Sequence, residues 1–97
     1  MSEIEPTATA EDSSAAPLYK VMLLNDDETP MEFVVEVLET MFGKSRDDAI
    51  KIMLRTHEDG VGVCGVYGEE QAKSLVGRVR AEAHSFQHPL QCVMERG

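Results

Sequence analysis

Three consecutive polar residues, Asn25, Asp26 and Asp27, stand between an apolar run and a predicted helix. Their short side chains accept hydrogen bonds from the backbone around them and so stabilise tight turns. Two carboxylates and an amide in one turn make an anionic corner, and Met31 stands beside it in the first turn of the helix with an apolar side chain. Such a corner is suited to hold a cationic group that is attached to an apolar one.

His57 is the second residue whose chemistry matters. It shares a predicted helical face with Met53 and Ile50, so its ring should lie at the edge of the core. Either it is a structural histidine whose charge favours the C-terminal helix dipole, or it belongs to a site. A metal site made of Asp26, Asp27 and His57 is a further alternative, although the paired histidine and carboxylate spacings typical of metal sites are missing.

The chain shows no enzyme motif. No Ser lies in a Gly-x-Ser-x-Gly turn, and no glycine-rich loop has the spacing that cradles phosphate. Cys64 and Cys92 lie far apart and form no Cys-x-x-Cys pair, which favours reduced core thiols over a disulfide framework or a metal site. We therefore expect neither catalysis nor a cofactor.

The formal net charge of -9 argues against binding to nucleic acid, whose phosphates require clustered Lys and Arg. No run is long and apolar enough to span a membrane, and the N-terminus lacks the basic and apolar regions of an export signal. We therefore expect a soluble, unexported protein. A disordered acidic arm over residues 1–17 is predicted before a core of residues 18–97, because the arm has no basic residue and contains Glu3, Glu5, Glu11 and Asp12.

The first predicted strand is Tyr19–Leu24, a short apolar run. After the turn, Thr29 is the predicted N-cap of a helix, Pro30 its first residue and Glu32 the partner in a capping box. Apolar residues then recur at helical spacing until Gly43, which is expected to end the helix.

Ser45 and Asp48 predict the N-terminal cap of a second helix, which Gly60 is expected to end. Val61–Tyr67 interleaves β-branched residues with glycines. This pattern predicts a strand in which Gly65 marks a bulge or a close backbone approach.

The third predicted helix has an apolar stripe from Ala72 to Ala83, and Gly77 within it suggests close packing. Pro89 prevents a further helix, and Leu90–Met94 is predicted to be the last strand. The resulting order β-α-α-β-α-β predicts an α+β fold, in which three helices cover one side of a small antiparallel three-stranded sheet.

Four motifs along the chain resemble those of the ClpS adaptor family. In order they are Leu24-Asn25-Asp26-Asp27-x-Thr29-Pro30-Met31-Glu32-Phe33-Val34, Met53-Leu54-x-x-His57-x-x-Gly60, Cys64-Gly65-Val66 and His88-Pro89-Leu90-x-Cys92. The resemblance covers residues 18–96. It implies a non-enzymatic bacterial adaptor that captures proteins by a destabilising N-terminal residue, which is bulky and hydrophobic or aromatic (Phe, Tyr, Trp or Leu). The captured protein would pass in the cytoplasm to the Clp ATPase and its protease, through the N-terminal domain of the ATPase.

The resemblance also implies roles for single residues. The α-amino group of the captured protein would be held by Asn25, Asp27 and His57. The apolar pocket for its first side chain would be lined by Met31, Val34, Met53, Thr56 and Leu90, with Asp26 and Thr29 on the rim. Met31 would exclude β-branched residues, and Glu70 would contact the ATPase.

Three places depart from the family pattern. Thr56 stands where Val is usual, and a hydroxyl in the pocket wall would lower the acceptance of Leu relative to Phe or Tyr. Glu28 replaces an aromatic residue and should favour a basic second residue in the ligand. Lys73-Ser74-Leu75 replaces Glu-Thr-Lys, so docking to the ATPase should differ. Two alternatives stay open: a second, divergent ClpS-type copy, and an acidic interaction module that does not read N-termini.

Overall fold

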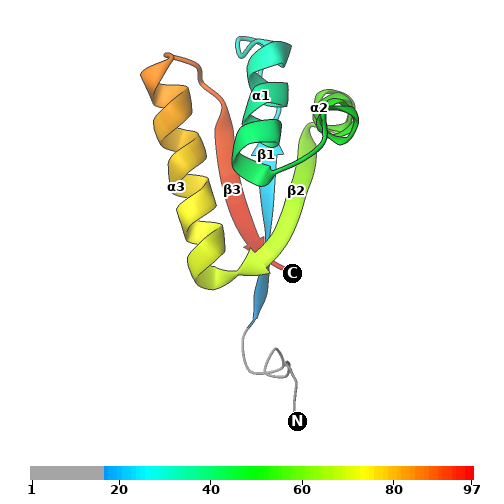
Figure 1. The fold of residues 1–97 in the computed structure, drawn as a ribbon. Helices are drawn as coiled ribbons and strands as arrows, with labels where there is room; N and C mark the ends of the chain where they lie inside the picture. The colour runs from blue at the N-terminus through cyan, green and yellow to red at the C-terminus, as the bar shows by residue number, and fades with distance from the viewer. Residues whose placement is uncertain (1–16) are drawn as a thin grey trace.

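The computed structural model describes residues 17–97 as an α+β fold (Figure 1). The order of its elements is the predicted β-α-α-β-α-β. The predicted acidic arm lies, apart from Pro17, outside the described residues. The six elements are β1 (Leu18–Leu24), α1 (Met31–Phe42), α2 (Arg46–Asp59), β2 (Val61–Gly68), α3 (Glu69–Ser85) and β3 (Gln91–Arg96).

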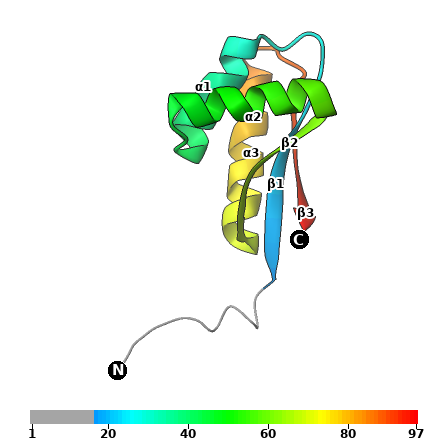
Figure 2. The same cartoon turned by 90° about the vertical axis from the view of Figure 1, so that its right-hand side faces the viewer.

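The sheet is antiparallel with β1 in its centre, in the order β2-β1-β3. All three helices lie on one face of it (Figure 2). Val21 and Leu23 of β1 are fully buried within the core, as the alternation of side chains along a central strand requires. The predicted architecture is therefore confirmed.

A bulge in β2 confirms the prediction made from Gly65. Val21 faces Gly65 and the next residue, Met22, faces Val63, so Cys64 is the extra residue on the bulged strand. The Cys64 side chain points into the core, where it is 1% exposed.

The predicted helix ends are confirmed at α2 and at the end of α1. Gly43 and Gly60 adopt the left-handed conformation with φ of 65° and 87°. The Ser45 hydroxyl accepts a hydrogen bond from the Asp48 N–H at 3.2 Å. These caps depend on neighbours in sequence, which is why the sequence predicts them well.

The predicted start of α1 was wrong by one residue and in its cap. Pro30 occupies the N-cap position, the helix begins at Met31, and no side chain caps it. The Thr29 hydroxyl instead donates to Asp26 Oδ2 at 2.7 Å. A threonine hydroxyl before a helix can either cap the helix or stabilise the preceding turn, and here it donates a hydrogen bond to the nearby carboxylate.

The close packing predicted at Gly77 was also wrong. Gly77 is exposed on α3, and a Cβ built there would have no neighbour within 4 Å.

We expect Gly77→Ala to raise the free energy of unfolding by about 0.5–1 kcal/mol, because it removes backbone entropy from the unfolded chain without a clash. Urea denaturation measures the change. Gly43→Ala is the matched control and should destabilise by about 1 kcal/mol, since φ there is 65°. Destabilisation by Gly77→Ala would contradict the finding that a methyl group at this position meets no neighbouring atom.

One polar end of the fold collects segments from four elements. The Asn25 N–H donates to the Gly60 carbonyl oxygen at 3.0 Å and so ties the turn after β1 to the end of α2. The loop before β3 packs on α1, because the His88 ring lies edge-on against Phe33 with ring centroids 4.6 Å apart. Among residues 17–97 no helix has the length and apolar character needed to cross a membrane.

Candidate functional site

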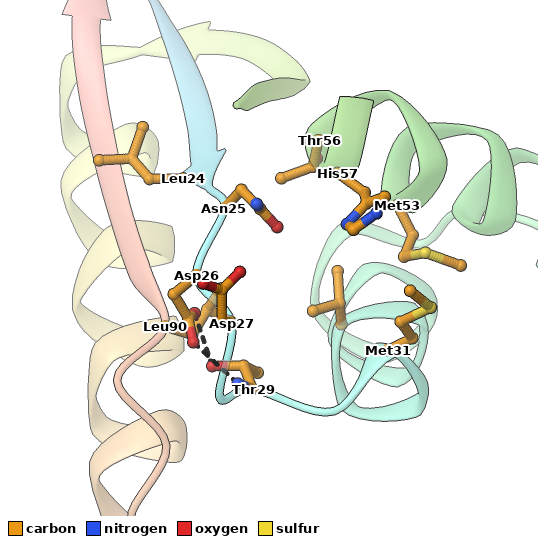
Figure 3. A pocket seen from close by; sticks show the side chains of 11 residues that line it. Leu24, Asn25, Asp26, Asp27, Thr29, Met31, Met53, Thr56, His57 and Leu90 are labelled. Carbon is orange, nitrogen blue, oxygen red and sulfur yellow. Dashed lines mark hydrogen bonds between the residues drawn. The ribbon is translucent and has the colours of Figure 1, made fainter. Parts of the chain in front are cut away.

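A cavity opens where the end of β1, the start of α1, the last turns of α2 and the residue before β3 meet (Figure 3). Its volume is about 130 Å³. The structure brings together in it all ten residues predicted for the amine site and the pocket. The lining residues are Leu24, Asn25, Asp26, Asp27, Thr29, Met31, Val34, Met53, Thr56, His57 and Leu90.

Leu24 is the lining residue that the sequence reasoning missed. It is the last residue of β1 and directly precedes Asn25. Its place at the start of the first motif, next to the polar turn, was the available signal, but the apolar run by itself indicated only a strand.

The polar mouth of the cavity is formed by Asn25, Asp27 and His57, all of them exposed. Figure 3 shows the Asn25 amide facing the His57 ring across the hollow, with the Asp27 carboxylate below Asn25. Within the described part of the chain, none of these three side chains has a hydrogen-bond partner or an ion pair. Three potential acceptors therefore remain free at the mouth.

The wall of the cavity is apolar and mostly buried, except at its edge. Val34 and Leu90 are 8% and 6% exposed and belong to the hydrophobic core. Met53 is half-buried against that core. Met31, by contrast, is 51% exposed and stands at the opening, where a flexible thioether side chain can adapt to what enters.

Asp26 and Thr29 line the cavity, but their polar groups bond to each other. Asp26 Oδ1 accepts from the N–H groups of Glu28 and Thr29, both at 2.8 Å, and Oδ2 accepts from the Thr29 hydroxyl. Burial raises the pKa of Asp26, but the hydrogen bonds from Thr29 and Glu28 outweigh burial and hold the pKa below its usual value. Asp26 is therefore ionised, and most of its capacity to accept hydrogen bonds is used within its own turn.

The Thr56 hydroxyl points away from the cavity. It donates to the Ile52 carbonyl oxygen at 2.8 Å, and a Cβ built on Gly62 would collide with Thr56 Oγ1. The hydroxyl thus lies between α2 and β2, which leaves the methyl group as the part of Thr56 that faces the cavity.

The remaining titratable candidates are structural. Within residues 17–97, no group of three or more His, Cys, Asp or Glu side chains, Asp26, Asp27 and His57 included, is arranged to hold a metal ion. Cys64 and Cys92 are free, buried thiols. Burial raises the pKa of Cys64 to about 12 and that of Cys92 to about 11, which makes both poor nucleophiles.

The positions predicted to contact the ATPase lie at the other end of the fold. Glu70 is exposed in the first turn of α3, which follows the pairing of Gly68 with Leu18 at the start of β1. Lys73 forms an ion pair with Glu69 at 3.2 Å, whereas Leu75 is 6% exposed. Leu75 is therefore a core residue and offers no surface for docking.

Three comparisons identify the family. The sequence model described as "ATP-dependent Clp protease adaptor protein ClpS" matches residues 14–93. A Clp protease adapter protein ClpS of Caulobacter vibrioides is 61% identical over 79 residues, which are 81% of this chain and 72% of the relative. The ClpS of Phenylobacterium zucineum is 56% identical over 90 residues, which are 93% of this chain and 83% of the relative.

The fold comparison agrees. The structure of Agrobacterium tumefaciens ClpS2 bound to L-phenylalaninamide superposes with a TM-score of 0.83 at 35% sequence identity. The match covers 84% of this chain and 99% of that one. The chain belongs to the ClpS family of adaptors of the ATP-dependent Clp protease.

Proposed function

We propose that this chain binds the N-terminal residue of other proteins when that residue is bulky and hydrophobic, namely Phe, Tyr, Trp or Leu, and delivers those proteins to the Clp ATPase and its protease. One observation carries the proposal. Free hydrogen-bond acceptors stand at the mouth of a cavity whose wall is apolar. Each half of this arrangement recognises one half of an N-terminal residue.

The polar half suits an α-ammonium group. Such a group has three N–H donors, and Asn25, Asp27 and His57 can each accept one, directly or through a water molecule. Hydrogen bonds to charged groups contribute about 1.5–3 kcal/mol each. The His57 imidazole must be neutral to accept.

The apolar half suits one side chain. A cavity of about 130 Å³ is close to the roughly 150 Å³ of an apolar cavity that holds benzene. Burying a Leu or Phe side chain contributes about 1.5–3 kcal/mol. Met31 at the opening would restrict branching next to the α-carbon.

Neither half is sufficient by itself. Micromolar affinity requires about 8 kcal/mol, and ordering and desolvation subtract from the sum of the contacts. A free amine and an apolar side chain on one residue occur together only at the start of a chain. The ligand of ClpS2, L-phenylalaninamide, carries both a free α-amino group and a benzyl group, which supports the proposal.

Fluorescence anisotropy with three labelled peptides tests it. The peptides share one sequence and begin with Phe, with Nα-acetyl-Phe or with Ser. We expect saturable binding of the first only. Equal binding of the acetylated peptide would favour the alternative, an interaction module that does not read N-termini.

The hydrogen bond of the Thr56 hydroxyl changes the prediction made from the sequence, in which this hydroxyl lowers the affinity for Leu relative to Phe. Because the hydroxyl is bonded to Ile52, the wall offers a methyl group, much as Val would. We expect Thr56→Val to change the ratio of the affinities for Leu and Phe peptides by less than about twofold, since one methyl group of the cavity wall is kept. Competition titrations measure the ratio. A larger shift would show that the hydroxyl turns into the cavity when a ligand is bound.

For delivery, we propose that the exposed start of α3, with Glu70, docks on the N-terminal domain of the Clp ATPase. An ATP-dependent partner needs ATP, so the proposal places this chain in the bacterial cytoplasm. The separation of α3's first turn from the cavity corresponds to the length of β1, roughly 20 Å for seven extended residues. Docking and peptide capture can therefore be tested separately.

We expect Glu70→Arg to weaken binding to the ATPase domain by roughly threefold or more, because it reverses an exposed charge. The affinity for a Phe peptide should stay unchanged. Biolayer interferometry with the isolated ATPase domain measures the first quantity, and Glu36→Arg on α1 is the charge-matched control. Equal losses in the two variants would mean that net charge, rather than this surface, governs docking.

A further inference from the structure

Asp26 has a different place in the cavity from its neighbours. Its carboxylate accepts three hydrogen bonds, from the Glu28 N–H, the Thr29 N–H and the Thr29 hydroxyl. An ionised carboxylate has about four sites for such bonds, so little capacity is left for a ligand. Figure 3 shows Asp26 turned toward Thr29, whereas Asn25 and Asp27 face the hollow bordered by His57.

We propose that Asp26 is the positioning residue of the amine site, which holds Asn25 and Asp27 in the orientation that receives the ligand's ammonium group and does not contact the ligand itself. The inference rests on the proposed function, because it assigns a role within the same site.

The hydrogen bonds of the turn support this assignment. Before Asp26, the Asn25 N–H is fixed on Gly60, and after the turn the Pro30 carbonyl oxygen accepts from Phe33 and Val34. Between those anchors, the bonds to Asp26 are the only hydrogen bonds of residues 26–29 within the described part of the chain. The path of the backbone on both sides of Asp27 therefore depends on the Asp26 carboxylate.

The side chains that need positioning are held only through the backbone of the turn. Asn25 and Asp27 are exposed and lack protein partners within residues 17–97, so their directions follow from the backbone of the turn. A turn that is ordered before binding spares the ligand the entropic cost of ordering it. Loss of the Asp26 bonds should therefore weaken the amine contacts and leave the apolar wall intact.

Two replacements of Thr29 give the mildest test. Thr29→Val keeps the size of the side chain and removes only the hydroxyl that donates to Asp26 Oδ2. Thr29→Ser keeps the hydroxyl and removes the methyl group. We expect Thr29→Val to lower the affinity for a Phe peptide by about threefold to tenfold, as one lost hydrogen bond to a charged group implies, and Thr29→Ser to restore most of it. An unchanged affinity of Thr29→Val would count against the proposal, because the orientation of the amine site would then not depend on this bond.

A double-mutant cycle gives the sharper test. Asp26→Ala is measured in the wild-type chain and in an Asn25→Ala/Asp27→Ala background, with weak affinities obtained by NMR titration. We expect a loss of at least tenfold in the wild-type chain and less than about twofold in that background, because Asp26 acts through the residues already removed. If Asp26→Ala lowered the affinity by the same factor in both backgrounds, Asp26 would contact the ligand independently of Asn25 and Asp27, and the proposal would be overturned.

Failure of this inference is distinguishable from failure of the proposed function. If the wild-type chain does not bind the Phe peptide, the proposed function fails. If it binds, but Thr29→Val and Asp26→Ala bind equally well, only the positioning role fails. Thermal unfolding of each variant by circular dichroism shows whether a loss of affinity reflects a loss of fold.

Discussion

Replacing Asp27 by Asn should lower the affinity for a peptide that begins with Phe by roughly 10- to 150-fold. The substitution keeps the shape of the side chain and removes its negative charge, and a charged hydrogen bond contributes about 1.5–3 kcal/mol. Folding should be unaffected, because Asp27 is exposed and has no hydrogen-bond partner within residues 17–97. Isothermal titration calorimetry gives the affinity, and urea denaturation gives the stability.

Glu36→Gln is the matched control for this prediction. It removes the same charge from an exposed position on α1 that does not line the cavity. Its affinity for the Phe peptide should stay within about twofold of the wild type, since separated surface charges interact weakly. A similar loss in both variants would point to long-range attraction by the acidic protein instead of a direct contact with Asp27.

The second large effect concerns pH. Histidine side chains gain a proton between about pH 8 and pH 5. An imidazolium ion cannot accept a hydrogen bond, and its positive charge repels a neighbouring ammonium group. Binding therefore favours neutral His57. We expect the affinity for a Phe peptide to be lower at about pH 5 than at about pH 7, a range over which the peptide's own amine stays mostly protonated.

His57→Gln separates this effect from other titrations. The Gln side-chain oxygen can accept a hydrogen bond, but it does not titrate. The variant should bind more weakly than the wild type at pH 7, because its geometry differs, and its affinity should be nearly constant as pH falls. A wild-type affinity that is flat over the same range would remove His57 from the amine site and return it to a purely structural role.

Local signals in the sequence predicted most of the fold. Gly43, Gly60 and Ser45 cap helices through contacts with residues close in the chain, so residue type and spacing were enough. Gly77 shows the limit of such reasoning. Whether a helix glycine allows close packing depends on what the rest of the fold places beside it, and here nothing lies there.

The membership of the site was also largely predictable, whereas the direction of its hydroxyl groups was not. Ten of the lining residues were predicted from the resemblance to the family, whereas Leu24, although it begins the first motif, was assigned only to the strand. The hydroxyl groups of Thr29 and Thr56 each had two possible roles. Thr29 bonds to Asp26 instead of capping α1, and Thr56 bonds to Ile52 instead of presenting its hydroxyl to the cavity. Such choices depend on three-dimensional geometry that spacing does not encode.

The arrangement divides recognition between an anionic rim and an apolar wall, and a crystal structure of this chain with a peptide that begins with Phe tests that division most directly. The N-terminal nitrogen should lie about 2.7–3.2 Å from acceptor atoms of Asn25, Asp27 or His57, or one water molecule away from them, with the phenyl ring between Met31 and Leu90. A peptide whose N-terminal nitrogen points into solvent, or which binds at another surface while this cavity stays empty, would contradict the account.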